Sequence, residues 1–254
     1  MRPTAAATLE RLFARPIAHR GLHDRRRGIV ENSLSAVSAA VAAGYGIEVD
    51  IQITADGRAV VFHDETLERL TETSGPVAAQ TAAELMRLAL KDSAAGDRLF
   101  GLDALFDAIG GRVPLVVEIK TLWNGDPRLA EVAAKAAARY GGPIALKSFD
   151  PLLVRTVRSI APDLARGVIG ETFRDPYWRP YLPVAERFRL RHLLHWPATR
   201  PDFLSWSLAD LGNLALRLAR RVGVPVMTWT VASPADAERA YRGADQIVFQ
   251  DFRP

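Results

Sequence analysis

The sequence predicts an α/β fold, a (β/α)₈ TIM barrel that occupies residues 1–254 as one domain. Short apolar runs alternate with amphipathic segments almost to the C-terminus, a pattern typical of parallel strands joined by helical crossovers. Eight such runs in a chain of 254 residues match a closed barrel. The alternative is an open doubly wound sheet, but no Gly-rich sequence follows the first strand to support dinucleotide binding.

Eight apolar runs are expected to form the barrel strands: residues 16–18, 46–53, 113–119, 144–146, 165–169, 192–196, 224–231 and 246–249. A further run, 59–62, follows the dipeptide Asp56-Gly57, which is a strong hairpin signal. We expect this run to return beside the second strand as a β-hairpin extension.

The segments between these runs have helical patterns, at residues 33–43, 102–109, 127–140, 151–160, 208–221 and 234–241. Asp126, Asp150 and Ser233 each stand before a proline, where an N-cap residue is expected before a proline at the first helical position. Two segments interrupt the alternation. Residues 66–100 form a small, partly helical insertion, and residues 171–183, rich in proline and aromatics, form a loop excursion.

The composition is that of an ordinary soluble globular protein, with 48% hydrophobic and 24% charged residues. Its formal charge of +4 is compatible with an anionic small-molecule substrate, and no Lys/Arg-rich tract with interleaved aromatics predicts nucleic-acid binding. The absence of cysteine excludes disulfides, thiolate metal sites and a cysteine nucleophile. No apolar run is long enough to predict a transmembrane segment, and the N-terminus is a poor secretory signal. We therefore expect a cytoplasmic protein, of undetermined oligomeric state.

The hairpin places chemically active side chains together. Glu48 and Asp50 are two residues apart on one strand and therefore share a face. If Asp56 and Gly57 form a two-residue loop, Asp50 lies opposite His63 on the same face, and Glu48 lies opposite Glu65. A longer loop would shift this register by one or two residues. An ordinary surface hairpin with solvated acids is the alternative interpretation.

Other polar residues follow the remaining strands, at the barrel end where catalytic residues gather. The first strand is followed by His19 and Arg20, and the third ends in Glu118-Ile119-Lys120. The fourth leads into Lys147 and Phe149, and the seventh contains Trp229. An apolar strand that ends in charged residues needs a functional reason, because isolated buried charges are costly.

These residue types suit phosphoryl chemistry. Glu48, Asp50 and Glu118 offer hard oxygen ligands of the kind that Mg²⁺ or Ca²⁺ prefers. Arg20 and Lys120 can bind a phosphate, while His19 and His63 titrate near neutrality and can transfer protons. Such a set can offset the charge that develops when an oxygen is displaced from phosphorus. A cluster of structural ion pairs is the alternative.

At these residues the chain resembles the glycerophosphodiester phosphodiesterase family. The matching pieces occur in the family's order, from residue 19 nearly to the C-terminus: His19-Arg20-Gly21, Glu31-Asn32, Glu48-Val49-Asp50, Asp56-Gly57, His63-Asp64, Leu67, Arg69, Glu118-Ile119-Lys120, Ser148-Phe149, Trp229-Thr230-Val231, Asp251 and Pro254. The chain departs from the family at Val30, Ser33 and the C-terminal Gln250-Asp251-Phe252-Arg253-Pro254. None of these departures is at a proposed ligand.

The resemblance implies a metal-dependent hydrolase that releases glycerol 3-phosphate and an alcohol from glycerophosphodiesters. Glu48, Asp50 and Glu118 then hold the divalent metal, His19 and His63 are the acid/base pair, and Arg20 binds phosphate. The order of the two histidines in proton transfer stays open.

Five further residues are candidates for positions behind the ligands or around the substrate: Glu31, Asn32, Lys147, Phe149 and Trp229. Glu31 orients Arg20 or a histidine, or merely supports the start of a helix, and Lys147 is either a phosphate contact or an ion-pair partner inside the barrel. Phe149 and Trp229 line the glycerol pocket or belong to the core. Two other functions stay open: a lysophospholipase D-type activity, suggested by Arg25-Arg26-Arg27 and the aromatic excursion, and a catalytically silent binding protein.

Overall fold

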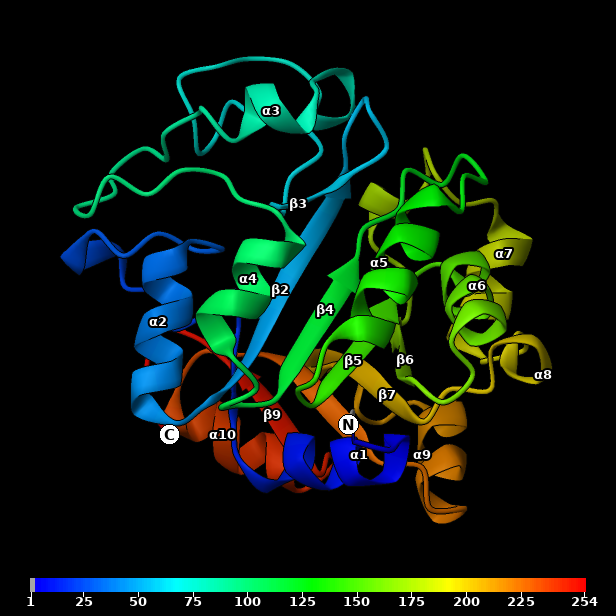
Figure 1. Cartoon of the computed structure of the whole chain (residues 1–254). Helices are drawn as coiled ribbons and strands as arrows, with labels where there is room; N and C mark the ends of the chain where they lie inside the picture. Colours follow the sequence, from blue (N-terminus) through cyan, green and yellow to red (C-terminus); the bar gives the residue numbers. More distant parts are fainter. Residues whose placement is uncertain (1–2) are drawn as a thin grey trace.

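The computed structural model describes residues 3–254 and shows a closed barrel of parallel strands surrounded by helices (Figure 1). The strand order is β1-β2-β4-β5-β6-β7-β8-β9, and β1 pairs with both β2 and β9, which closes the barrel. The predicted (β/α)₈ fold is therefore confirmed. The barrel strands are β1 (Ile17–Ala18), β2 (Gly46–Ile53), β4 (Leu115–Ile119), β5 (Ile144–Ser148), β6 (Ala165–Gly170), β7 (Phe203–Ser207), β8 (Val226–Val231) and β9 (Gln246–Phe249).

The longer helices pack around this barrel: α2 (Leu34–Ala43), α4 (Leu102–Ile109), α5 (Arg128–Arg139), α6 (Pro151–Ile160), α9 (Leu214–Arg221) and α10 (Pro234–Tyr241). Asp150 and Ser233 are the predicted N-caps, and their side chains accept hydrogen bonds from backbone N–H groups of the first turn. At α5 the cap is Pro127 rather than Asp126, so this helix starts one residue later than expected. The predicted helix 208–221 is divided into a short 3₁₀ turn and α9, which Asn213 caps.

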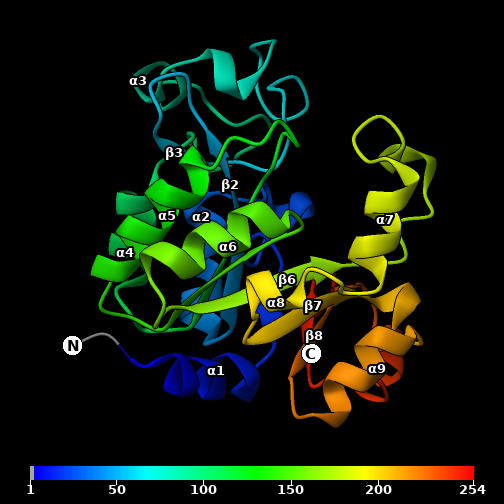
Figure 2. The same ribbon diagram turned by 90° about the vertical axis from the view of Figure 1, so that its right-hand side faces the viewer.

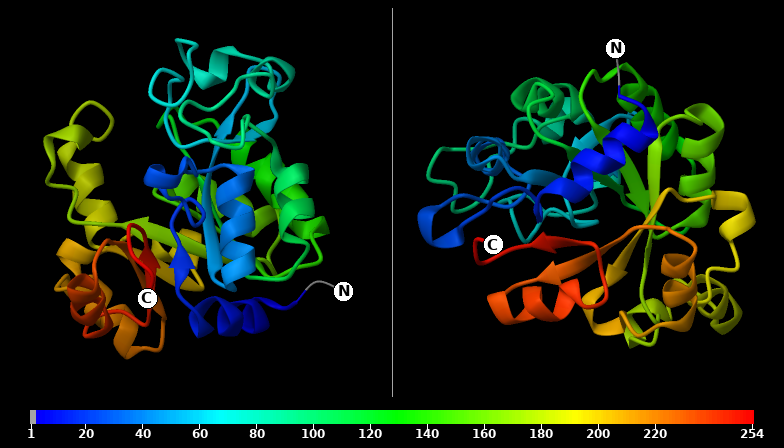
Figure 3. Two further views of the ribbon diagram at one scale, coloured as in Figure 1. Left: turned by 90° about the vertical axis from the view of Figure 1, so that its left-hand side faces the viewer. Right: turned by 90° about the horizontal axis from the view of Figure 1, so that it is seen from below.

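The N-terminal end of the barrel is closed by a helix that the sequence patterns did not predict, α1 (Ala5–Ala14), which lies across the strand starts (Figure 3). Leu12 of α1 packs in the same cluster as Ile17, Phe203 and other side chains of the barrel interior. Gly167 makes room there, because a Cβ at this position would lie 2.4 Å from the Phe203 ring. With this end filled by apolar side chains, the opposite end is left for polar residues.

The hairpin forms, but its register differs from the prediction. Strand β3 (Ala59–Val61) pairs Ile51 with Val61 and Ile53 with Ala59, so Asp50 lies opposite residue 62 rather than His63. The expected pairing of Asp50 with His63 is wrong, and that of Glu48 with Glu65 fails with it. The loop has three residues because Gly57 adopts a left-handed conformation (φ 72°), the geometry of a type I turn followed by a bulge.

His63 nevertheless reaches the barrel mouth by another route. The chain leaves the ladder after Val61, and the Gln52 side chain donates hydrogen bonds to the carbonyl oxygens of His63 (2.9 Å) and Asp64 (3.0 Å). An interior side chain of β2 therefore positions the His63 segment, in place of cross-strand pairing.

The predicted sixth strand, 192–196, is also wrong. These residues connect α7 (Val184–Arg191) to α8 (Trp196–Thr199), and the strand in this part of the chain is β7, Phe203–Ser207. Burial alternates at Leu193, Leu194 and His195, as it would in a strand, but a helix begins at Trp196 with Pro197 in its first turn. His195 is buried beside Thr199 and does not line the cavity at the mouth.

Two excursions flank the mouth of the barrel (Figure 2). One is the predicted insertion, which contains α3 (Ala82–Leu85) and packs Leu67, Val77 and Leu85 into a small core of its own. The other, residues 172–194, contains a 3₁₀ turn (Pro176–Trp178) and α7, and is called the arm below. No helix within residues 3–254 is long and apolar enough to cross a membrane.

Candidate active site

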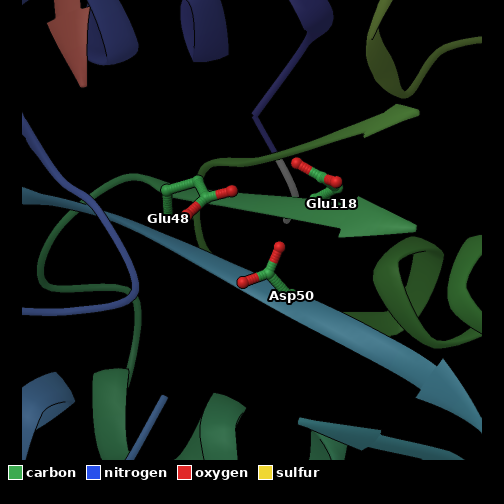
Figure 4. Close-up of side chains that lie close together, drawn as sticks. All are labelled: Glu48, Asp50 and Glu118. Carbon is green, nitrogen blue, oxygen red and sulfur yellow. The ribbon is translucent and has the colours of Figure 1, made fainter. Parts of the chain in front are cut away.

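Three buried carboxylates meet inside the barrel mouth (Figure 4). Glu48 and Asp50 point inward from β2, and Glu118 points inward from β4, where it pairs in register with Asp50. Each residue offers one oxygen, and these oxygens lie within 4.8 Å of one another. The alternation of a strand and the parallel register thus bring together the three acids that the sequence predicted.

Two lysines balance this negative charge, together with Arg20, whose Nε lies 3.4 Å from Asp50 Oδ2. Lys147, 2% exposed, lies with its Nζ 3.1 Å from Glu48 Oε1 and 3.7 Å from Glu118 Oε2. Lys120 Nζ donates to Glu118 Oε1 at 2.6 Å and lies 2.9 Å from Asp50 Oδ1. Burial is the largest single influence and would raise the pKa of Asp50 and of Glu118, but the surrounding cationic groups, Lys120 foremost, together outweigh it and lower both pKa values. Asp50 and Glu118 are therefore available as anions.

The donor set fits a divalent cation. Carboxylate oxygens are the ligands that Mg²⁺ and Ca²⁺ prefer, and three of them converge here on one point. Within residues 3–254, Glu48 Oε1 is buried and accepts no well-directed hydrogen bond, despite the nearby Lys147 amine. A buried carboxylate oxygen in that state is costly, and a cation would stabilise it.

His19 lies directly after β1, at the rim of the same cavity. Its Nδ1 is 2.7 Å from Gln250 Oε1, and the Gln250 amide nitrogen donates to Asp251 Oδ2 at 2.9 Å, which sets the amide orientation. With its Nδ1–H donated to Gln250, the neutral ring keeps Nε2 as a proton acceptor. Burial lowers the pKa of His19, and this effect outweighs the opposing charge of Glu48, so the ring is neutral at pH 7.

A chain of ion pairs joins the two sides of the site. Arg20 Nη1 donates to Glu31 Oε1 (2.6 Å), and Arg69 binds both Glu31 and Asp64. Asp64 Oδ1 in turn lies 2.7 Å from His63 Nδ1. Glu31 therefore orients Arg20 directly and His63 through Arg69 and Asp64. The structure thus places Glu31 in the orienting position, one of the alternatives that the sequence left open.

We expect this chain of ion pairs to make stability depend on pH. Burial would raise the pKa of Glu31, but hydrogen bonds from Arg69 and Arg20 and their charges lower it to about 2. A lowered folded-state pKa stabilises the protein above the unfolded value, and this stability disappears as the pH falls toward 2. Because Arg69 is 45% exposed, solvent screening reduces the contribution to roughly 1–2 kcal/mol.

Urea unfolding of the Glu31→Gln variant measures this contribution. The variant is expected to be less stable than the wild type at pH 7, and the difference should shrink between pH 4.5 and pH 3. Glu72→Gln is the matched control. Glu72 is 90% exposed, and its ion pair with Lys91 is long, at 3.8 Å, so it contributes little to stability. A difference that stays constant with pH would contradict the assignment.

The backbone at Arg20, Gly21 and Asn32 turns tightly and adopts the left-handed conformation. All three have positive φ angles (55°, 77° and 52°), and a Cβ on Gly21 would lie 2.8 Å from that of Ala36. The Asn32 side chain donates to Asp50 Oδ2 at 2.9 Å and accepts from the Asp50 N–H. Asn32 therefore holds a metal-ligand candidate in place from the neighbouring loop.

The cavity at the mouth has a volume of about 540 Å³, and its lining combines charged residues with a group of aromatic rings that contact one another. Phe149 and Trp229, both predicted from the sequence, line this cavity and contact each other with their ring centroids 5.7 Å apart. The rest of the aromatic wall is Trp123, Tyr177, Trp178 and Tyr181. A cavity of this size and lining suits a small anionic organic molecule.

Sequence reasoning missed part of the site. Arg69, the partner of Asp64, matches the family pattern, and Gln250, the partner of His19, departs from it. The sequence predicted no role for either residue. Gln52 and Trp123 gave no signal, since a glutamine in a strand and a tryptophan in a loop are common. The aromatic excursion was a usable signal for Tyr177 and its neighbours, since exposed aromatics in a loop favour binding.

Comparison with known proteins agrees with the geometry. The glycerophosphoryl diester phosphodiesterase family matches residues 19–252. A protein of Caldanaerobacter subterraneus subsp. tengcongensis named glycerophosphodiester phosphodiesterase is 30% identical over 244 residues, 92% of this chain and 93% of the relative. A putative glycerophosphodiester phosphodiesterase of Bacillus subtilis is 25% identical over 249 residues, 93% of this chain and 95% of that protein.

Solved structures show the same fold. The Oleispira antarctica phosphodiesterase, in complex with the product sn-glycerol-3-phosphate, superposes with a TM-score of 0.74 at 22% identity, over 93% of this chain and 92% of that one. A putative glycerophosphoryl diester phosphodiesterase of Silicibacter pomeroyi gives 0.73 at 24% identity, over 97% and 94%. Because the family matches nearly the whole chain and a 30% identical relative is covered almost end to end, the chain belongs to the glycerophosphoryl diester phosphodiesterase family of phosphoric diester hydrolases.

Proposed function

We propose that this protein hydrolyses glycerophosphodiesters to glycerol 3-phosphate and an alcohol, with a divalent cation held by Glu48, Asp50 and Glu118. The observation that carries the proposal is that the three acids converge beside one cavity of about 540 Å³, which Asp50 and Glu118 line together with His19 and His63. Family membership supports the reaction class. The sequence match alone would not require the side chains to converge.

The chain's own residues account for the remaining chemistry. Arg20 and Lys120 lie at the cavity and offset the charge of the phosphate, with Arg20 held in place by Glu31. One histidine takes the proton of the neighbouring glycerol hydroxyl as that oxygen attacks phosphorus, and the other protonates the alcohol that leaves. Water then opens the cyclic phosphate with the two roles reversed. A bound divalent cation would act as a Lewis acid that withdraws charge from the phosphoryl oxygens.

Removal of the cation is expected to abolish the activity. Release of glycerol 3-phosphate from glycerophosphocholine or glycerophosphoethanolamine should stop in EDTA and return with Mg²⁺, Ca²⁺ or Mn²⁺. Isothermal titration calorimetry gives a second readout: the Asp50→Asn variant should bind the cation at least about tenfold more weakly than the wild type. Undiminished turnover in chelator, or equal affinities for the cation, would contradict the proposal.

The aromatic wall favours a second candidate substrate on the same site, a lysophospholipid cleaved in the manner of a phospholipase D. Trp123, Tyr177 and Trp178 line the cavity and offer an apolar surface to the acyl chain, which stays on the glycerol phosphate when the head-group alcohol leaves. A series of lysophospholipids with increasing acyl length decides between glycerophosphodiesters and lysophospholipids as substrates. Activity restricted to the water-soluble diesters would exclude lysophospholipids. The third possibility, a silent binding protein, predicts the loss of a histidine or an acid of the site, and all five are present.

A further inference from the structure

The arm, residues 172–194, is more basic than the rest of the molecule. It contains five arginines against Asp175 and Glu186, whereas the whole chain has 33 basic and 29 acidic residues. The arm therefore carries three of the four net positive charges. Within residues 3–254, only Arg189 among its arginines has a carboxylate at ion-pair distance, namely Glu186 at 3.0 Å. The others are Arg174, Arg179, Arg187 and Arg191.

The same arm exposes large apolar side chains. Val184 is 73% exposed and Phe188 is 58% exposed, and their four-residue spacing places them on one face of α7. The Phe188 ring lies 4.3 Å from that of His192, one turn further along this face, and Leu194 beyond the helix is 57% exposed. Exposed apolar side chains collected on one short segment usually mark a binding surface.

This surface is continuous with the active-site cavity. Tyr177 is 58% exposed and also lines the cavity, together with Trp178 and Tyr181 of the arm. Trp178 packs against Phe173 in a small cluster that fastens the arm to the barrel mouth. Figure 2 shows the arm standing at the mouth, on the other side from the α3 insertion.

We propose that the arm docks on an anionic lipid surface, with Val184, Phe188 and Leu194 entering the interface and Arg174 and Arg179 contacting the head groups. Basic residues interspersed with exposed aromatic and aliphatic side chains are the composition that binds such interfaces. A second copy of the chain fits less well, because a two-fold contact would face the net positive charge of one arm with that of the other. Docking in this way brings the cavity mouth to the lipid surface.

This inference concerns binding and does not depend on the proposed reaction. Its test is co-sedimentation of the protein with vesicles of phosphatidylcholine alone or mixed with phosphatidylglycerol, at low and high ionic strength. We expect binding to the mixed vesicles only, weakened by salt. The double variant Arg174→Gln/Arg179→Gln should bind roughly 25-fold more weakly, at about fivefold per arginine. The double variant Val184→Ser/Phe188→Ser should lose about tenfold or more.

Two controls separate the arm from other surfaces of similar composition. Leu214→Ser/Leu218→Ser removes exposed leucines of the same spacing on α9, and Arg25→Gln/Arg26→Gln removes charge from the other arginine cluster. Both should bind vesicles as the wild type does. All four variants should retain turnover of glycerophosphocholine in solution, since none of these side chains lines the cavity.

The inference is overturned if the wild type binds neither vesicle or both equally, or if the control variants lose as much binding as the arm variants. It is also overturned if the arm variants change the sedimentation coefficient of the protein rather than its vesicle binding, which would identify the arm as a contact between copies. Vesicle binding without hydrolysis would instead refute the proposed function alone.

Discussion

Replacement of His19 by alanine is expected to lower kcat by about 10²- to 10⁴-fold, the range for loss of a proton-transfer residue. The neutral His19 ring, held through Nδ1 by Gln250, is positioned to move a proton at Nε2. The His63→Ala variant is expected to lose as much, because Asp64 holds the ring of His63 in the same manner. Steady-state kinetics on glycerophosphocholine measure both losses.

His23→Ala is the matched control, since His23 lies four residues away but outside the cavity, and its turnover should stay near the wild-type value. A second substrate separates the two roles. A nitrophenyl phosphodiester of glycerol has a leaving group that departs without protonation, so the variant of the histidine that serves as acid should recover most of its rate on it. Recovery by neither variant would contradict the proposed division of proton transfer.

Replacement of Lys147 by methionine is expected to destabilise the protein by about 3–5 kcal/mol, the usual cost of removing one partner from a buried ion pair. Lys147 is 2% exposed, and Glu48 beside it is fully buried, so water cannot replace the lost charge. Methionine fills about the same space as the lysine side chain, so the loss of stability reports the removal of the charge. Thermal unfolding in EDTA should show a fall in Tm of about 6–20 °C.

A divalent cation should reverse much of this loss, because it would restore positive charge beside Glu48 and Glu118. The rise in Tm on adding Mg²⁺ or Ca²⁺ is therefore expected to be larger for Lys147→Met than for the wild type. Lys135→Met, an exposed position on α5, is the control and should change neither quantity. If the Lys147→Met protein is destabilised but gains no more from the cation than the wild type does, the carboxylates are not the metal site.

The fold was predictable because most barrel strands are buried on both faces and read as apolar runs, such as 113–119 and 246–249. The prediction failed at 192–196, where a short stretch between two helices has the same local alternation as a strand. Strand β7, Phe203–Ser207, contains two serines and lacks an obvious apolar run, although all but its last residue are buried. Only packing between β6 and β8 distinguishes these two segments.

The acids and the cations of the site were also predictable, because a charged residue at the end of a buried strand needs a partner. The hairpin register was not, because one residue in the loop moves every cross-strand pair and depends on the conformation of Gly57. The sequence left Lys147 open as a phosphate contact or an ion-pair partner. In the structure it is buried and forms an ion pair with Glu48.

The sequence by itself determined the barrel, the family resemblance and the list of candidate catalytic and metal-binding residues, since periodicity and motif order are local properties of the chain. The tertiary structure alone decided which side chains meet: His19 with Gln250, Glu31 with Arg69, and the arm with the cavity. Glu31 and Arg69 are 38 positions apart in the chain, and His19 and Gln250 are 231 positions apart. Their geometry depends on barrel closure and loop conformation, and neither leaves a repeating pattern in the sequence.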